Sequence, residues 1–301
     1  MYGPADEQES IATIHAAIDA GVTLLDTGDF YGTGHNELLI GRAIKDRRDR
    51  VLVSVKFGAL RAPDGNWIGF DARPQAVKNF LAYSLVRLGV DHIDIYRPAR
   101  LDPAVPIEET IGAIADLVKA GYVRHIGLSE VGPDTIRRAH AVHPITDLQI
   151  EYSLISRGPE AKIFPLLEEL GIGVTAYGVL SRGLLSGSKP QGPGDFRGYL
   201  PRFSGENRAQ NERLVTALAE LAAEKGATAA QLAIAWVLAQ NERIVPVIGA
   251  RTRAQLAQSL AALDLVLSSD DLARIEAAVP ATEVAGTRYD EHQMRVLDSE
   301  R

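Results

Sequence analysis

The chain has 301 residues and a formal net charge of −7, with 46% hydrophobic and 24% charged residues. It contains no lysine- or arginine-rich run and no apolar run of the roughly 18 residues that a membrane helix needs, so we expect neither nucleic acid nor a membrane as a partner. The absence of cysteine excludes disulfides and cysteine metal ligands and is typical of the reducing cytoplasm. We therefore predict a soluble, cytoplasmic protein.

Short apolar runs rich in valine and isoleucine are the predicted strands. They do not alternate strictly between apolar and polar residues, which is typical of strands that are buried on both faces of a parallel sheet. In chain order the runs are Val22–Asp26, Val51–Lys56, His92–Tyr96, Val123–Ser129, Leu148–Tyr152, Ile172–Tyr177 and Ile244–Gly249.

Longer amphipathic segments lie between these runs, and several end at a glycine, the residue that commonly follows the last helical turn. The predicted helices are Gln8–Ala20, Asn36–Lys45, Arg73–Leu88, Ile107–Ala120, Pro133–Val142, Glu160–Leu170, Asn207–Lys225, Thr228–Ala239, Arg253–Leu263 and Ser268–Ala278. Alternating strands and helices predict parallel strands joined by right-handed crossovers. Ser186–Gly205 shows no periodicity and is predicted to be a functional loop. No linker divides the chain, so we expect a single domain over residues 1–301.

Polar or aromatic residues stand where most of the predicted strands end. In a (β/α)8 barrel the carboxyl ends of the strands form one mouth, and the chemistry occurs there. A structural ion pair is the alternative explanation for an aspartate and a lysine in that mouth, but buried ion pairs contribute little to stability, which favours a functional site. The strand-end residues are Asp26, Lys56, Ser129 followed by Glu130, Gln149, Tyr177 and Gly249.

The segment GVTLLDTGDFYG (Gly21–Gly32) resembles the signature of the aldo-keto reductases, in which an aspartate precedes the catalytic tyrosine by five residues. The segment VSVKFG places a lysine at the end of the next strand, as in that family. The resemblance continues in the family's order through IGLSE, LQIEYSL, AYGVLSRGLLSG and IVPVIGARTRAQLAQSL, and so covers essentially the whole chain. It implies an α/β fold, the (β/α)8 TIM barrel, and an NADP-dependent oxidoreductase with Asp26, Tyr31 and Lys56 as catalytic residues.

The residue chemistry agrees with this resemblance. Reduction of an aldehyde or ketone to an alcohol needs a hydride, which NADPH supplies, and a proton for the oxygen. A tyrosine is a weak acid with a pKa of about 10, but a nearby ammonium group favours its phenolate form. Lys56 can play this part for Tyr31, and Asp26 can hold Lys56 charged and in place. We predict that Tyr31 is the proton donor.

The resemblance also implies which residues bind NADPH. The nicotinamide carboxamide would contact Ser129, Glu130 and Gln149, and the nicotinamide ring would stack on Tyr177. The pyrophosphate would be held by Leu180, Arg182, Gly183 and Leu185. The adenosine end would contact Gly249, Arg251, Gln255, Gln258 and Ser259. Among these, Arg251 is the candidate for the 2′-phosphate, because a guanidinium can donate two hydrogen bonds to phosphate oxygens. Relatives often carry asparagine in place of Glu130, and other residues in place of Gln255, Gln258 and Ser259.

One departure from the family concerns the substrate. Relatives usually place a histidine near the substrate carbonyl, and Ala99 stands at that position in IDIYRPARLDP. The segment YRPARLD is similar to the corresponding segment of the pyridoxal reductases of this family, and Arg100 would add charge at the mouth. Ala99 indicates either a loss of activity or a substrate that carries its own polar group. The resemblance suggests pyridoxal for the second alternative, since its ortho hydroxyl group forms an internal hydrogen bond to the aldehyde.

Two further expectations follow. By resemblance, family members begin with a hairpin and a first barrel strand ahead of the segment MYGPADEQES. Either the native protein is longer than this sequence, or the sheet has seven strands with an open seam between Val22–Asp26 and Ile244–Gly249. The alternative function is that of a non-catalytic NADPH-binding regulatory or redox-sensing subunit, as in the potassium-channel β-subunits. No metal site is predicted, since His140 and His143 have no further ligands at useful spacing.

Overall fold

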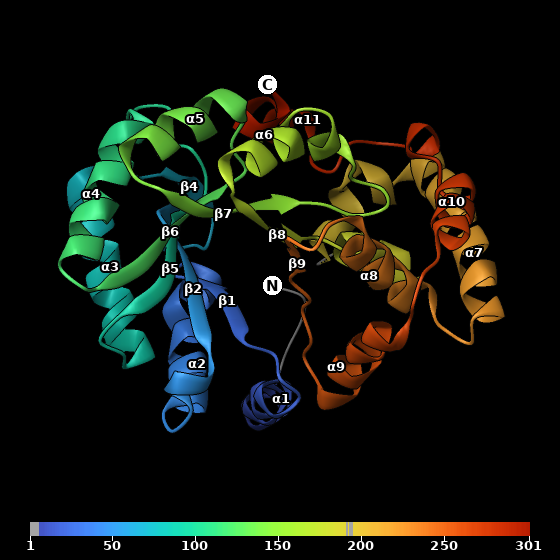
Figure 1. Cartoon of the computed structure of the whole chain (residues 1–301), viewed down its shortest axis with the longest axis horizontal. Helices are drawn as coiled ribbons and strands as arrows, with labels where there is room; N and C mark the ends of the chain where they lie inside the picture. The colour runs from blue at the N-terminus through green and yellow to red at the C-terminus, as the bar shows by residue number, and fades with distance from the viewer. Residues whose placement is uncertain (1–5, 191, 193–194) are drawn as a thin grey trace.

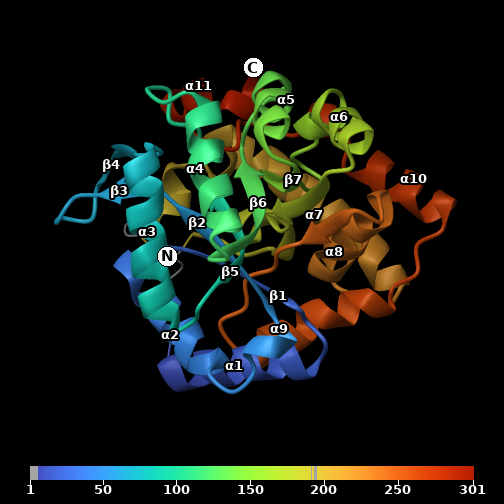
Figure 2. The ribbon, with the colours of Figure 1, turned by 60° about the vertical axis from the view of Figure 1, so that its left-hand side comes forward.

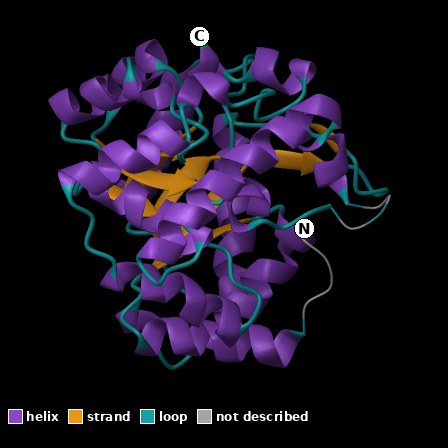
Figure 3. Cartoon of the chain, turned by 90° about the vertical axis from the view of Figure 1, so that its right-hand side faces the viewer, coloured by secondary structure: helices purple, strands orange, loops and turns teal. Residues whose placement is uncertain are grey.

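The computed structural model describes residues 6–190, 192 and 195–301. Its centre is a curled sheet of seven parallel strands in the order β1-β2-β5-β6-β7-β8-β9, with helices arranged around it (Figures 1 and 3). This confirms the predicted parallel sheet and its strand count within the described residues. The strands are β1 (Leu24–Gly28), β2 (Leu52–Phe57), β5 (Ile93–Pro98), β6 (Val123–Ser129), β7 (Ile145–Glu151), β8 (Gly173–Tyr177) and β9 (Ile244–Pro246).

The helices confirm the predicted segments to within a few residues. They are α1 (Glu7–Asp19), α2 (His35–Ile44), α3 (Pro74–Leu88), α4 (Ile107–Lys119), α5 (Pro133–Val142), α6 (Ile163–Leu170), α7 (Gly205–Glu224), α8 (Ala229–Gln240), α9 (Arg253–Leu260) and α10 (Ser269–Ala278). The short helix α11 (Glu291–Val296) was not predicted. Among the described helices, none combines the length and the hydrophobicity that crossing a membrane requires.

The hairpin of β3 (Ala59–Arg61) and β4 (Trp67–Phe70) was also missed by the sequence analysis. It projects from the molecule beside α3 (Figure 2). The predicted loop Ser186–Gly205 contains two short 3-10 turns, Phe196–Tyr199 and Pro201–Phe203, and is otherwise irregular where described. Residues 191, 193 and 194 of this loop lie outside the described residues.

The two faces of the curled sheet differ in chemistry. Side chains alternate along a strand, so that Val53 and Val55 of β2 lie in the apolar core while Ser54 and Lys56 contact Asp26 of β1. The apolar face packs against the helices, and the polar face lines the interior. This interior differs from that of many barrels, in which branched aliphatic side chains fill the space between the strands.

The sheet has two edges, β1 and β9, which confirms the predicted open seam within the described residues. The helices α1 and α9 lie side by side at this seam (Figure 1). Arg253 of α9 donates a hydrogen bond to Glu9 of α1 at 2.9 Å. This ion pair is partly exposed and therefore contributes little to stability.

Candidate active site

The three predicted catalytic residues lie together at the carboxyl ends of β1 and β2. The parallel register of these strands places Asp26 opposite Ser54, two residues before Lys56. The Lys56 ammonium donates to Asp26 Oδ2 at 2.5 Å and to the Thr27 carbonyl at 3.0 Å. Tyr31 begins the 3-10 turn Tyr31–Gly34, and the centre of its ring lies 5.1 Å from Lys56 Nζ. A buried ion pair therefore stands beside an accessible tyrosine.

Asp26 is held as a carboxylate by its surroundings. Burial opposes its ionisation, but the charges of Lys56 and Arg97 outweigh burial and place the pKa of Asp26 below its usual value. Ser54 and Gln149 donate hydrogen bonds to Asp26 Oδ1 at 2.9 and 2.8 Å. Since Oδ1 has these two donors, Oδ2 faces Lys56.

Aromatic and small apolar residues surround Tyr31. The Phe30 ring packs edge-on against Tyr31 at 4.7 Å and against Trp67 of the hairpin at 5.5 Å, measured between ring centres. Phe30 also clusters with Ala59 and Ala99. Ala99 is almost fully buried and presents no side-chain hydrogen-bond donor. The walls near the tyrosine are therefore suited to an apolar or aromatic carbonyl compound.

The residues predicted to contact nicotinamide gather at the ends of β6, β7 and β8. Ser129 pairs in register with Gln149, and the Glu130 backbone N–H donates to the Gln149 carbonyl at 3.0 Å. Tyr177 ends β8, and its hydroxyl donates to Glu130 Oε1 at 2.7 Å. The four residues thus form one group across three neighbouring strands.

Glu130 has the most densely bonded side chain in this group. Its φ of +54° lies in the left-handed region, which few residues other than glycine adopt. Arg288 donates to both carboxylate oxygens at 2.8 and 2.6 Å, and Ser299 donates to Oε2 at 2.7 Å. Although burial opposes ionisation, the Arg288 contacts hold the pKa of Glu130 well below its usual range. Glu130 is therefore a carboxylate whose two oxygens already accept several hydrogen bonds from the protein.

The C-terminal segment supplies residues that the sequence analysis missed. Besides Arg288 and Ser299, it contributes Tyr289, whose hydroxyl lies 3.0 Å from that of Tyr177 and accepts from Arg100 at 3.4 Å. No sequence signal marks these residues, because 158 positions separate Glu130 from Arg288. Only the folded chain shows that this segment covers the ends of β6 and β8.

The predicted pyrophosphate residues occupy the 3-10 segment Ser181–Ser186 and the residue before it, Leu180. The backbone is left-handed at Ser181, Arg182 and Gly183, which turns the chain tightly at the end of β8. Leu185 is buried beneath this turn. The tight turn brings the Arg182 guanidinium to the strand ends.

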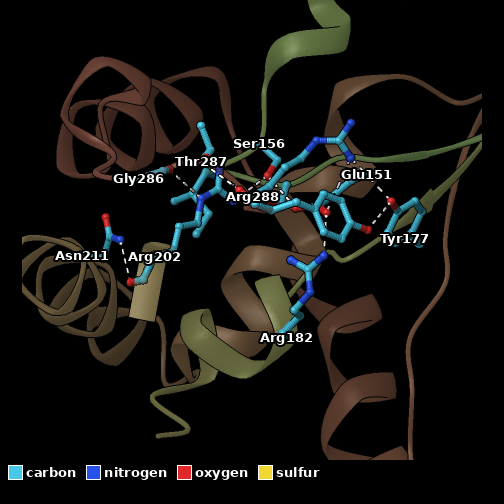
Figure 4. Close-up of polar contacts among 12 residues, drawn as sticks. Glu151, Ser156, Tyr177, Arg182, Arg202, Asn211, Gly286, Thr287 and Arg288 are labelled. Carbon is cyan, nitrogen blue, oxygen red and sulfur yellow. Dashed lines mark hydrogen bonds and ion pairs between the residues drawn. The ribbon is translucent and has the colours of Figure 1, made fainter. Parts of the chain in front are cut away.

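Three arginines surround Glu151, the last residue of β7 (Figure 4). Their nearest nitrogens lie 3.3 Å (Arg182), 3.6 Å (Arg288) and 3.7 Å (Arg202) from the Glu151 carboxylate. Burial lowers the pKa of Arg202, and the neighbouring arginines lower it further. Arg202 was not predicted as part of the site. Arg288 also pairs with Glu130 and Glu300, so the cluster joins three arginines to three carboxylates at the ends of β6 and β7.

The residues predicted to bind adenosine lie on an exposed rim after β9. Gly249 and Arg251 belong to the loop, whereas Gln255, Gln258 and Ser259 belong to α9. The Arg251 backbone N–H donates to Gln255 Oε1 at 2.9 Å, and the Ser259 hydroxyl donates to the Gln255 carbonyl at 3.1 Å. Because α9 packs against α1, this rim lies next to the seam.

Comparison with known proteins identifies the family and agrees with the fold. The model of the aldo/keto reductase family matches residues 1–280. The chain belongs to the aldo/keto reductase family. This aldo/keto reductase is 44% identical over 292 residues to a probable aldo-keto reductase 1 from Glycine max, covering 95% of the chain and 84% of the relative.

Solved structures extend the comparison. The aldo/keto reductase superposes with a TM-score of 0.85 on a glycerol dehydrogenase from Gluconobacter oxydans, at 29% identity over 93% of this chain and 88% of that one. A Klebsiella pneumoniae aldo/keto reductase in complex with NADP and acetate gives a TM-score of 0.74 at 28% identity, over 94% and 89% of the two chains. The chain is thus an oxidoreductase of this family, with a seven-stranded version of the barrel in the described residues.

Proposed function

We propose that this aldo/keto reductase uses NADPH to reduce an aldehyde or ketone to an alcohol, with Tyr31 as the proton donor. The observation that carries the proposal is the buried Asp26–Lys56 ion pair, whose ammonium lies 5.1 Å from the centre of the Tyr31 ring. Such a pair is a weak source of stability, and its position at the strand ends gives it a chemical role. The relative from Klebsiella pneumoniae, solved with NADP, supports the choice of cofactor.

The residues present fit NADPH. Ser129 and the Gln149 amide offer a hydroxyl and an amide to a carboxamide, and Tyr177 offers a ring. Within the described residues, the buried Ser181 hydroxyl has no hydrogen-bond partner, and it lies in the tight turn beside Arg182 where a diphosphate would be held. When bound, the cofactor supplies the hydride.

Each catalytic side chain then has one task. Tyr31 donates its hydroxyl proton to the carbonyl oxygen of the substrate. The Lys56 ammonium stabilises the phenolate that this transfer leaves, and Asp26 keeps Lys56 charged and oriented. The Lys56 and Asp26 side chains are buried, which strengthens the electrostatic interactions that Lys56 makes.

The finer proposal is that the substrate is an aromatic aldehyde with an ortho hydroxyl group, such as pyridoxal. Ala99 offers no hydrogen bond to the carbonyl, so a substrate that carries its own donor is favoured. The neighbouring Arg100 guanidinium lies 3.4 Å from Ser129 Oγ and remains charged, because Tyr177, Tyr289 and Glu130 outweigh burial and raise its pKa. Aromatic packing against Phe30 and Trp67 would hold the ring.

The experiment measures NADPH oxidation with pyridoxal, with an aromatic aldehyde lacking the ortho hydroxyl, and with an aliphatic aldehyde. We expect turnover in the wild type and a near-complete loss in Tyr31→Phe, with NADPH binding by fluorescence titration unchanged. Ala99→His should increase turnover of the aliphatic aldehyde more than that of pyridoxal. An unchanged ratio of the two rates would contradict the substrate assignment.

A second candidate function is an NADPH-binding regulatory or redox-sensing subunit. It is favoured by Ala99, which removes the usual donor, and by Glu130, whose oxygens are engaged by Arg288 and Ser299. Tight NADPH binding without turnover of any carbonyl compound would identify this function and exclude the reductase.

A further inference from the structure

Arg97 of β5 is a charged side chain with no exposed surface, inside the curled sheet. One end of its guanidinium donates to Asp147 Oδ2 of β7 at 2.8 Å, and the other end donates to Ser54 Oγ of β2 at 2.9 Å. Within the described residues, Arg97 Nε and Asp147 Oδ1 are buried without a partner. A pair with unsatisfied atoms is costly for stability, so stability alone does not explain its presence.

The neighbouring strands are shaped around this pair. Gly127 of β6 leaves the necessary room, because a Cβ at this position would lie 2.6 Å from Asp147 Oδ1 and 3.1 Å from Arg97 Cζ. Thr175 of β8 donates a hydrogen bond to Asp147 Oδ2. The guanidinium is therefore fixed by its Asp147 partner and by the space around it.

A directed hydrogen-bond chain connects Arg97 to the catalytic ion pair. A guanidinium only donates, so Ser54 Oγ accepts from Arg97, and its single hydrogen is available for Asp26 Oδ1 at 2.9 Å. Gln149 supplies the second donor to Oδ1, at 2.8 Å. Asp26 Oδ2 is thereby left to Lys56.

We propose that Arg97 is a positioning residue, which acts through Ser54 to keep Asp26 ionised and turned toward Lys56. The inference rests on the proposed function, in which Asp26 holds Lys56 next to Tyr31. After Lys56, Arg97 is the second positive charge that favours the Asp26 carboxylate. The negative charge of Asp147, which pairs with Arg97, weakens this effect. The charged groups that act on Asp26 are Lys56 from β2 and Arg97 from β5. Behind them, Asp147 of β7 pairs with Arg97 and the Tyr31 ring lies near Lys56, while Glu37 of α2 acts on Asp29 in the turn after β1.

The test follows the pH titration of the Asp26 carboxyl carbon by 13C NMR, with the signal assigned by its loss in Asp26→Asn. Removing a cation disfavours the carboxylate, so Arg97→Gln should raise the titration midpoint by about one pH unit. Arg97→Lys should raise it less, and Asp147→Asn should lower it or leave it unchanged. This readout needs no turnover, so it stands even if no carbonyl compound is reduced.

The double variant Arg97→Met with Asp147→Leu covers the case in which Arg97→Gln does not fold. Apolar replacement of a buried pair is commonly neutral or stabilising, so thermal stability should be retained while the Asp26 midpoint is still raised. Turnover should fall about tenfold in Arg97→Gln and in the double variant, with KM nearly unchanged, because a misplaced catalytic group slows the reaction step.

The matched control is Arg48→Gln. Within the described residues, Arg48 donates hydrogen bonds to Asp94 Oδ2 at 2.6 Å and to the Val51 and His92 carbonyls, away from the catalytic residues, so the midpoint of Asp26 should not move. An unchanged Asp26 midpoint in folded Arg97→Gln and in the double variant would overturn the proposal, as would an equal shift in Arg48→Gln. A retained midpoint shift with no turnover in the wild type would instead refute the reductase function alone.

Discussion

Asp29 lies on the turn between Asp26 and Tyr31, with 8% of its surface exposed. Its Oδ2 accepts a weak hydrogen bond from the Gly58 backbone N–H at 3.4 Å, and its Oδ1 has no partner among the described residues. Burial raises the pKa of Asp29 to about 7, and the carboxylate of Glu37 adds to the rise. The folded chain therefore keeps a proton on Asp29 at pH values where the unfolded chain has released it.

This difference makes stability depend on pH. Between 3.8 and about 7 the native state binds more protons at Asp29 than the unfolded state, so the free energy of unfolding falls as pH rises. The side chain in the Asp29→Asn variant cannot ionise, so its free energy of unfolding should not fall in this pH range. At pH 8 the variant should be more stable than the wild type by at most about 4 kcal/mol. Urea unfolding of both proteins at pH 5 and pH 8 measures the gap. Parallel pH dependence in the two proteins would contradict the raised pKa.

Arg251 is the candidate for coenzyme discrimination. It lies on the exposed rim before α9, and a guanidinium there can pair with the 2′-phosphate that only NADPH carries. We expect Arg251→Ala to weaken NADPH by roughly tenfold or more while NADH binding changes little, since a lost charge-assisted contact acts only on the phosphorylated cofactor.

Fluorescence titration with both cofactors measures this ratio. Arg253→Ala is the matched control, because Arg253 is a neighbouring arginine that already pairs with Glu9. Equal weakening of NADPH and NADH by Arg251→Ala would show that the discriminating cation is another residue.

At the scale of elements, the Glu130–Arg288 ion pair fastens the C-terminal segment to the end of β6. Arg288→Met would leave the Glu130 carboxylate buried without its cation, which costs about 3–5 kcal/mol of the free energy of unfolding. Adding Glu130→Gln removes the unpaired charge and should restore part of this loss. Urea unfolding of the wild type and both variants measures the two differences.

Arg137→Met serves as the control for this prediction. Arg137 also makes a two-fold contact with Glu169, with both distances 2.9 Å, but both side chains are more than half exposed. Its replacement should change stability little. A similar loss in the two single variants would show that burial of Glu130 is not what makes its pair important.

The elements differ in how far the sequence could predict them. Strand β6 and helix α5 have the predicted bounds, because their apolar patterns and flanking residues are local signals. The β3–β4 hairpin was missed since strands of three and four residues are too short to show periodicity, although Asp64-Gly65 is a turn signal.

In the candidate site too, some residues could be predicted from the sequence and others could not. The proximity of Asp26, Tyr31 and Lys56 could be predicted, because the first two lie five residues apart on β1 and the turn after it and the third lies near the end of the neighbouring strand. Their catalytic roles stay a prediction. Arg288, Arg202 and the Arg97–Asp147 pair could not be predicted, because tertiary folding alone decides which of the 32 lysines and arginines meets which carboxylate.

At the scale of the molecule, the sheet of the described residues has β1 and β9 as its edge strands, and an edge strand has no partner strand on one side. Closing a barrel requires every strand to be paired on both sides. We expect an N-terminal extension with a family-like hairpin and strand to raise the free energy of unfolding by roughly 3 kcal/mol or more, since each fully buried valine or leucine contributes about 1.5–3 kcal/mol. Urea unfolding measures the gain.

A glycine- and serine-rich extension of the same length is the control for this comparison. It adds chain without apolar side chains or strand propensity, so it should leave stability unchanged. Equal stability of the two extended proteins would mean that the seam is already closed by side chains and does not accept a strand.

During synthesis on the ribosome, the Glu130–Arg288 contact can form only late, because Arg288 follows Glu130 far along the chain. Synthesis proceeds from the N-terminus, and 158 residues must follow Glu130 before its arginine emerges. During that interval Glu130 has Arg100 as a nearby cation but lacks the two hydrogen bonds from Arg288, so its burial would be costly. We therefore expect the end of β6 to stay hydrated until the segment that carries Arg288 has been translated.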